Sequence, residues 1–114
     1  MTNVYRQEIW FVNLNPHGSG REIHGKRPAL VVSDDYFNES AADLVMVLPI
    51  TSTPRNIPSH IKIDPPEGGV KKISFIKCDQ IRTISKSRFI DRLGTVSNET
   101  MAKVEDTLRI LLSL

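Results

Sequence analysis

GREIHGKRPALVVS, residues 20–33, joins a charged loop with two glycines to an uninterrupted apolar run. The run, residues 28–33, does not alternate between apolar and polar side chains, and it opens with a proline where a missing N–H is tolerated. We therefore predict a strand that is buried on both faces, with Arg27 at its mouth. An arginine held between a flexible loop and a rigid strand is suited to binding a phosphate.

Strand patterns on either side of this stretch predict a mostly β protein. Residues 8–14 (EIWFVNL) and 44–51 (LVMVLPIT) have the aromatic and aliphatic composition of strands. Pro49 predicts an edge position for the second of them, or a bulge near Thr51. Shorter segments complete the pattern: strands at 60–63, 73–79 (continuing through 80–84 after a bend) and 92–96, loops at 16–26, 52–58 and 64–69, and helical turns near 36–37 and at 85–89.

The last segment, residues 97–114, has the clearest helical pattern. Ser97 is a good N-cap, and Glu99 lies in the first turn, where the helix dipole favours a negative charge. Apolar residues at helical spacing form one stripe that we expect to pack on the sheet: Met101, Val104, Leu108, Leu111 and Leu112. The sequence therefore predicts a single domain, residues 1–114, built as a small, largely antiparallel β-barrel closed by a C-terminal helix.

The bulk properties exclude several classes of protein. The single cysteine, Cys78, allows no intrachain disulfide and favours a cytoplasmic protein. No uncharged apolar run approaches the ~18 residues of a membrane span, and the opening residues MTNVYRQEIW lack the apolar core of a signal peptide. The net charge of +2 permits a nucleic-acid partner without requiring one.

The chemical motifs that are easiest to recognise are missing from the sequence. His17, His24, His60 and Cys78 have no metal-ligand spacing, so we predict no metal and no cofactor. There is also no P-loop and no Gly-x-Ser-x-Gly elbow. What remains is a group of arginines, hydroxyls and carboxylates at predicted strand ends. Such a group suits metal-independent cleavage of a phosphodiester by the neighbouring 2′-OH. The alternative is that these residues are solvated strand ends that form weak surface pairs.

Motifs along nearly the whole chain, in order, resemble those of the MazF/PemK/Kid toxins of bacterial toxin–antitoxin systems. They are EIWFVNLNP (8–16), GREIHGKRPALVVS (20–33), VLPITS (47–52), CDQIRTISKSR (78–88) and RLGTVSNETMAKVEDTLR (92–109). The resemblance implies an SH3-like barrel that works as a homodimer. It implies a sequence-specific, metal-independent endoribonuclease that cuts single-stranded RNA and leaves 2′,3′-cyclic phosphate and 5′-OH ends. It also implies an antitoxin whose disordered C-terminal tail folds into the RNA groove.

The resemblance also assigns catalytic roles. Arg27 and Thr51 match a pair to which many members assign catalysis, and because arginine is a poor proton donor we expect Arg27 to act as an electrostatic clamp. A second proposal for the family uses an aspartate as base and a preceding basic residue as acid, which are Asp79 and Lys77 here. The histidine that accompanies them in the family is replaced by Arg21. This favours Arg27 and Thr51 as the core of the site, with Asp79 and Lys77 in support.

Further residues are expected to bind the RNA. Glu22 is a candidate for orienting Arg27 or the 2′-OH, and the loop at 52–58 is expected to contact unstacked bases. A regular strand would place Lys77 and Asp79 on one side with Arg82, and Gln80 on the other unless a bend intervenes. The expected substrate-binding residues are Arg21, Glu22, His24, Ser52, Thr53, Arg55, Asn56, Gln80 and Arg82.

Two other functions stay open at this point. A gyrase-poisoning toxin of the same fold would need a polar-aromatic end to the last helix, whereas this chain ends in Leu-Leu-Ser-Leu. A non-catalytic member that only binds RNA or an antitoxin is disfavoured by the presence of both Arg27 and Thr51.

Overall fold

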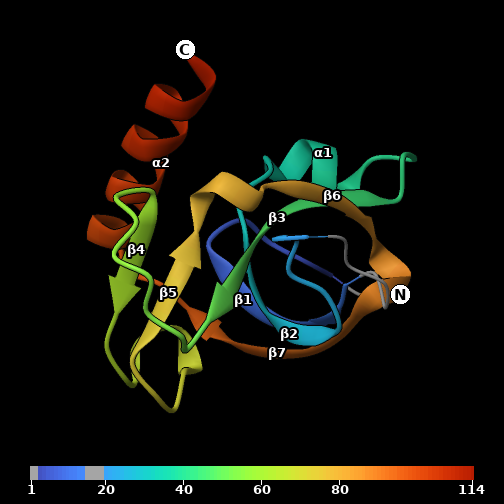
Figure 1. The fold of residues 1–114 in the computed structure, drawn as a ribbon. Coiled ribbons are helices and arrows are strands. Elements are labelled where there is room, and N and C mark those ends of the chain that lie inside the picture. Colours follow the sequence, from blue (N-terminus) through green and yellow to red (C-terminus); the bar gives the residue numbers. More distant parts are fainter. Residues whose placement is uncertain (1–2, 15–19) are drawn as a thin grey trace.

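The computed structural model of the chain describes residues 3–14 and 20–114 (Figure 1). Its strands are β1 (Glu8–Asn13), β2 (Lys26–Val31), β3 (Leu44–Thr51), β4 (His60–Ile63), β5 (Ser74–Lys77), β6 (Arg82–Ser85) and β7 (Phe89–Thr95). Its helices are α1 (Asp35–Glu39) and α2 (Asn98–Leu112), with short 3-10 turns η1 (Glu67–Gly69), η2 (Cys78–Gln80) and η3 (Lys86–Arg88). Residues 15–19 of the predicted loop at 16–26, with His17, lie outside the described residues.

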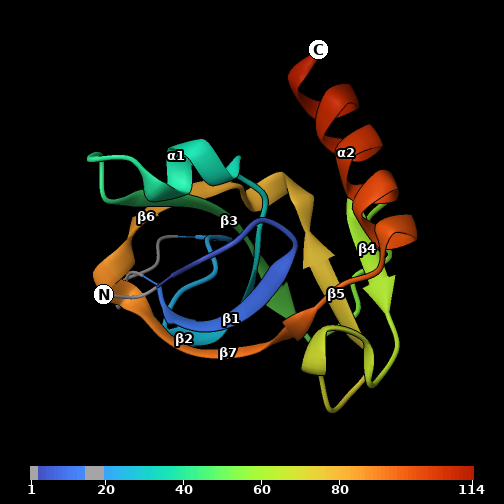
Figure 2. The ribbon, with the colours of Figure 1, turned by 180° about the vertical axis from the view of Figure 1, so that it is seen from behind.

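The strands form one strongly curved antiparallel sheet in the order β4-β5-β3-β2-β1-β7, with β6 paired to β3. Figure 1 shows β1, β2, β3, β6 and β7 bending round in a small barrel-like arrangement. Figure 2, the view from behind, shows α2 standing beside β4 and β5. Within the described residues the end strands β4 and β7 do not pair, so the sheet is not closed. The predicted small antiparallel barrel with a C-terminal helix is confirmed in this open form.

β3 lies in the middle of the sheet, so the edge position predicted from Pro49 is wrong. One side of β3 pairs with β2. The other side pairs with β6 as far as Val47 and with β5 from Ile50 onward. Pro49 stands between those two pairings, at the place where β3 changes neighbours. The missing N–H of proline therefore costs no hydrogen bond to a second strand there.

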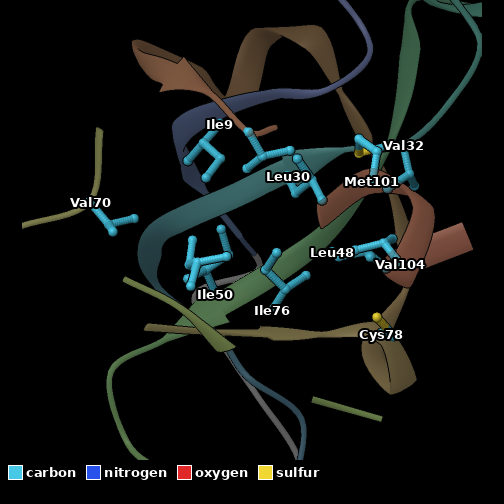
Figure 3. Close-up of a cluster of buried hydrophobic side chains, with 12 residues drawn as sticks. Ile9, Leu30, Val32, Leu48, Ile50, Val70, Ile76, Cys78, Met101 and Val104 are labelled. Atoms are coloured by element: carbon cyan, nitrogen blue, oxygen red, sulfur yellow. The ribbon is translucent and has the colours of Figure 1, made fainter. Parts of the chain in front are cut away.

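Two hydrophobic clusters cover the two faces of the central strands. We call them the helix-side core, which includes Met101 and Val104 of α2, and the loop-side core, which includes Ile23. Figure 3 shows the helix-side core, where Leu30 and Leu48 lie among side chains from β1, β5 and α2. Neighbouring residues of β2 and β3 alternate between the two cores. Burial on both faces explains why these strands are continuous apolar runs.

Helix α2 begins where predicted, but only the first part of its apolar stripe packs in the core. The Ser97 hydroxyl accepts a hydrogen bond from the Thr100 N–H and caps the helix. Met101 and Val104 are buried and Leu108 packs against them, whereas Leu111 and Leu112 are 45% and 50% exposed. The expectation that the whole stripe packs on the sheet is therefore wrong for the last turn, which extends beyond the sheet (Figures 1 and 2).

The segment after Ile73 departs from the regular strand expected there. β5 ends at Lys77, and Cys78–Gln80 form the turn η2 before β6 begins at Arg82. Asp79 therefore lies on a turn, and the anticipated bend falls between Lys77 and Arg82. The last strand begins at Phe89, three residues before its predicted start at Arg92. No helix among the described residues has the length and apolar character needed to cross a bilayer.

Candidate active site

Strand register brings Arg27 and Thr51 to the same face of the sheet. Ala29 pairs with Pro49, so two residues further along both strands Arg27 and Thr51 stand opposite each other. Both side chains line a cavity of about 420 Å³. Thr51 is 9% exposed, and its hydroxyl oxygen accepts a hydrogen bond from the Thr53 N–H, 3.2 Å away. The hydroxyl proton is therefore free to be donated to a ligand.

The backbone of the preceding loop orients Arg27. The Nε–H of Arg27 donates to the His24 carbonyl oxygen at 2.9 Å. This leaves the two terminal amino groups of the guanidinium available to a phosphate. Glu22, which we expected to orient Arg27, lines a different cavity, and among the described residues it forms no salt bridge with Arg27. His24 contributes its carbonyl to the site, while its own residue is exposed.

Lys77 reaches the same face from the neighbouring strand. Thr51 pairs with Phe75, and Lys77 lies two residues further along β5. The residue is only 8% exposed. Burial lowers the pKa of Lys77 from its ordinary value of 10.5, and the positive charges of Arg55, Arg27 and Arg21 add to this effect against the opposing influence of Asp79. An ammonium group that gives up its proton more readily than usual is suited to act as a general acid.

Asp79 lies beyond the end of β5, on η2, and faces a histidine. Its Oδ1 is 3.2 Å from His60 Nε2, and its side chain is 35% exposed. Asp79 also contributes to a second cavity of about 660 Å³, which is lined by Arg21, Glu22, Asp79, Gln80, Ile81 and Arg82. A part-exposed carboxylate in a polar cavity is able to accept a proton from a bound hydroxyl.

Gln80 and Arg82, both predicted to bind substrate, hold the backbone of the loop before β2. The Gln80 amide accepts from the Ile23 N–H and donates to the Arg21 carbonyl, both at 2.8 Å. Nη2 of Arg82 donates to the Ile23 carbonyl, also at 2.8 Å. The side chain of Ile23 is buried in the loop-side core. Residues 21–23 are thus fastened to η2 and β6, which fixes the position of Arg21 and Glu22 in the second cavity.

The predicted base-reading loop at 52–58 borders both the site and a third cavity. Ser52 lines the cavity of Arg27 and Thr51, while Asn56 lines a cavity of about 300 Å³ with His60 and Phe75. Thr53 and Arg55 are exposed, and Arg55 is close enough to act on the pKa of Lys77. Polar and cationic groups of this loop are therefore available to RNA bases and phosphates.

Other reactive groups of the chain do not form a site. Among the described residues no group of three or more histidine, cysteine and acidic side chains is arranged to hold a metal ion. Cys78 is buried, and its burial, together with the negative charge of Asp79, raises the pKa of its thiol to about 12. A thiol that stays protonated under working conditions is a poor nucleophile.

The structure adds residues that the sequence did not assign to the site. Phe11, Lys26 and Lys72 line the cavity of Arg27 and Thr51, and His60 pairs with Asp79. The only feature of the sequence that could have placed His60 near Asp79 is the pair of neighbouring strand patterns at 60–63 and 73–77, which form a hairpin in the structure. Its register, in which His60 faces Lys77, depends on the length of the turn between the strands.

Comparison with known proteins gives one consistent result. Residues 5–112 match the family described as "PemK-like, MazF-like toxin of type II toxin-antitoxin system". The chain is 35% identical to endoribonuclease EndoA of Bacillus subtilis over 112 residues, which is 97% of this chain and 96% of EndoA. The crystal structure of MazF from Deinococcus radiodurans superposes with a TM-score of 0.86 at 25% identity, covering 100% of both chains.

A second solved structure contains a partner. A mycobacterial endoribonuclease in complex with its cognate antitoxin is similar to this chain with a TM-score of 0.79 at 27% identity. The similarity covers 97% of this chain and 96% of the mycobacterial one.

Proposed function

The chain belongs to the PemK-like, MazF-like toxins of type II toxin–antitoxin systems, and we propose that its endoribonuclease activity cuts single-stranded RNA by intramolecular transfer of the phosphate to the neighbouring 2′-OH. The observation that carries this proposal is the register that sets Arg27 opposite Thr51 in one cavity, with Lys77 on the same face. These groups supply positive charge and hydrogen-bond donors to a phosphate without a metal ion.

Arg27 and Thr51 act on the scissile phosphate. The guanidinium, held by the His24 carbonyl, pairs with two phosphate oxygens, and the Thr51 hydroxyl donates to one of them. As the 2′-oxygen attacks phosphorus, negative charge grows on those oxygens, and fixed donors stabilise it more than they stabilise the bound substrate.

Asp79 and Lys77 carry out the two proton transfers, as base and acid respectively. The Asp79 carboxylate takes the proton of the 2′-OH as the new bond to phosphorus forms. Lys77 gives a proton to the 5′-oxygen as the bond between that oxygen and phosphorus breaks. The products are a 2′,3′-cyclic phosphate and a free 5′-OH, and the catalytic groups regain their protonation states by exchange with water. The lowered pKa of Lys77 supports this role.

The cavity of Arg21 and Glu22 and the loop at 52–58 are the proposed base-binding surfaces. Each contributes a cation that acts on Lys77, namely Arg21 and Arg55, which supports contacts with nucleotides next to the cut. Cationic side chains around them favour the RNA backbone: Arg21, Lys26, Arg55, Lys71 and Lys72.

The partners follow from the family. An antitoxin binds this toxin, and we propose that a disordered tail of that antitoxin folds into the RNA groove and blocks it. We also propose a homodimer formed through the exposed apolar end of α2, where Ile110 and Leu112 are 79% and 50% exposed. The RNA substrate and the lone cysteine favour action in the cytoplasm.

The proposed chemistry is tested with purified protein and a long single-stranded RNA in EDTA. Cleavage at a short motif is expected, and the new 5′-OH ends should accept phosphate from polynucleotide kinase without prior dephosphorylation. Arg27→Ala should abolish cleavage with the fold intact, as judged by circular dichroism. Lys62→Ala, a surface change on β4 outside the three cavities, serves as the matched control. Intact RNA with folded wild-type protein would refute the proposal, and RNA binding without cleavage would identify a non-catalytic member.

A further inference from the structure

His60 is a buried titratable residue that the proposed mechanism does not use. Its side chain is 3% exposed, and its Nε2 lies 3.2 Å from Oδ1 of Asp79. Its other ring nitrogen, Nδ1, is buried and has no hydrogen-bond partner among residues 3–14 and 20–114. His60 pairs in register with Lys77, so its ring belongs to the same face of the sheet as the proposed acid.

The surroundings favour a proton on Nε2 of the ring. A proton there lets that nitrogen donate to the Asp79 carboxylate. A ring with its only proton on Nδ1 would place the Nε2 lone pair against a carboxylate oxygen and would leave a buried N–H unpaired among the described residues. The contact with Asp79 therefore requires a proton on Nε2.

The contact with His60 constrains the carboxylate of Asp79, which lies on a short turn. Asp79 belongs to η2, and besides the contact with His60 the turn is tied to the start of β4 by the Cys78 N–H, which donates to the Ser59 carbonyl at 3.2 Å. With Oδ1 engaged by His60, Oδ2 is left to accept a proton from the substrate. Asp79 is one of the charged groups that act on Lys77, and the others are Arg55, Arg27 and Arg21.

We propose that His60 is a positioning residue: its ring, protonated on Nε2, holds the Asp79 carboxylate in the orientation needed to accept the 2′-OH proton. This inference rests on the proposed function. The ring also lines the cavity that contains Asn56 and Ile57 of the loop at 52–58. A nucleotide that moves this loop therefore acts on the same ring that holds the carboxylate.

The activity test is a double-mutant cycle measured by single-turnover cleavage of a short RNA that carries the mapped motif. His60→Phe keeps the ring shape without the donor, and we expect it to slow cleavage by roughly tenfold, within the range of coupling between contacting residues. KM should change little, because the proposed role of the ring is to orient Asp79 and not to bind the RNA. His60→Gln should restore part of the rate, since an amide N–H is able to reach Asp79. In an Asp79→Ala background, His60→Phe should have almost no further effect.

The controls separate positioning from folding and from the proposed function. Ile63→Val alters a buried side chain of the same strand without touching Asp79 and should leave the rate unchanged. Equal effects of His60→Phe with and without Asp79, or a change confined to KM, would overturn the inference while leaving the endoribonuclease proposal intact. If the wild-type protein does not cut RNA, the proposed function fails. ¹⁵N NMR of the wild-type imidazole then still tests the pair, and a ring with no proton on Nε2 would contradict it.

Discussion

Lys77 is buried, whereas most lysines in folded proteins are exposed to solvent. It ends β5 with 8% of the residue exposed, and three arginines act on it. An ammonium in such a place gains little from water and is repelled by its neighbours, so it releases its proton at a lower pH than a surface lysine. The binding of an RNA phosphate would oppose this effect, because a negative charge favours the protonated form.

The first prediction concerns the alkaline side of the pH–rate profile. If protonated Lys77 is the general acid, single-turnover cleavage should fall as the pH rises through its lowered pKa, at a pH below 10.5. Lys77→Ala should reduce the rate by about 10²- to 10⁴-fold. Lys77→Arg keeps the charge and should move the alkaline fall to a higher pH. A profile that is unchanged in Lys77→Arg would assign the proton transfer to another group.

At the scale of elements, the start of α2 depends on a carboxylate from η1. Oε2 of Glu67 accepts hydrogen bonds from the Thr100 hydroxyl at 2.5 Å and from the Ser97 N–H at 3.1 Å. Burial alone would raise the pKa of Glu67, but these hydrogen bonds, together with the nearby Lys103, lower it from 4.5. The ionised form is therefore the one that stabilises the fold.

The second prediction follows from the lowered pKa of Glu67. The stabilisation by Glu67 is present above its unfolded pKa of 4.5 and is lost as the pH falls through the lower pKa of the folded state. Glu67→Gln should reduce the free energy of unfolding by about 1 kcal/mol at neutral pH. The difference between the variant and the wild type should shrink in acid, as measured by urea unfolding across the pH range. A constant difference would show that the charge of Glu67 is irrelevant.

The third prediction concerns the loop that carries Arg21 and Ile23. Gln80→Ala removes the acceptor of the Ile23 N–H and the donor to the Arg21 carbonyl. We expect faster hydrogen exchange at Ile23 and a cleavage rate lowered by about tenfold, because a misplaced site loses its pre-organisation. Thr83→Ala, on the exposed face of β6, is the matched control. Unchanged exchange at Ile23 would mean that the loop is held by its buried side chain alone.

Local patterns were reliable where one interaction decided the outcome. The Ser97 cap and the turn at 85–89 each depend on neighbouring residues, and both appear in the structure. The strand predicted at 28–33 also appears, but it is shifted by two residues to Lys26–Val31, so Arg27 is its second residue and does not precede it. Pro49 misled because its missing N–H falls where β3 changes neighbours, which is a property of three other strands. The last turn of α2 misled because periodicity shows which residues share a face but not where the sheet beneath them ends.

The sequence predicted which residues form the candidate site better than it predicted which residues hydrogen-bond to them. Arg27 and Thr51 were expected together, and the register places them opposite each other. The pairing of Asp79 with His60 and the hold of Gln80 on the loop depend on contacts between residues 19 and 57 positions apart. No spacing rule along the chain connects residues so distant, since only the hairpin register and the bend at η2 bring them together.

At the scale of the whole molecule, the exposed end of α2 is the clearest surface for self-association. Met101 and Val104 anchor the helix, whereas Ile110 and Leu114 are 79% and 86% exposed. Apolar side chains that project from the body of the protein in this way are more stable when a second surface covers them.

The fourth prediction tests the proposed homodimer. Ile110→Glu should leave the fold unchanged, because the Ile110 side chain is exposed and does not pack in the protomer's own core. It should weaken dimerisation by at least about tenfold, as expected when a charge is placed in an apolar interface. Light scattering after size-exclusion chromatography measures this directly. Ala102→Glu adds the same negative charge at an exposed position near the buried start of α2 and serves as the control. A wild-type chain that is monomeric at high concentration would reject the dimer.

The change of neighbours along β3 divides the proposed site between two parts of the sheet. Arg27 belongs to the part formed with β1 and β2, whereas Lys77 belongs to the ribbon of β4 and β5, and the two parts are joined along β3 near Pro49. The helix-side core spans both parts, because Ile9 and Leu30 pack with Ile76 in one cluster. The spacing between the clamp and the acid is therefore set by this core, and a substitution that disturbs its packing would alter cleavage without touching either residue.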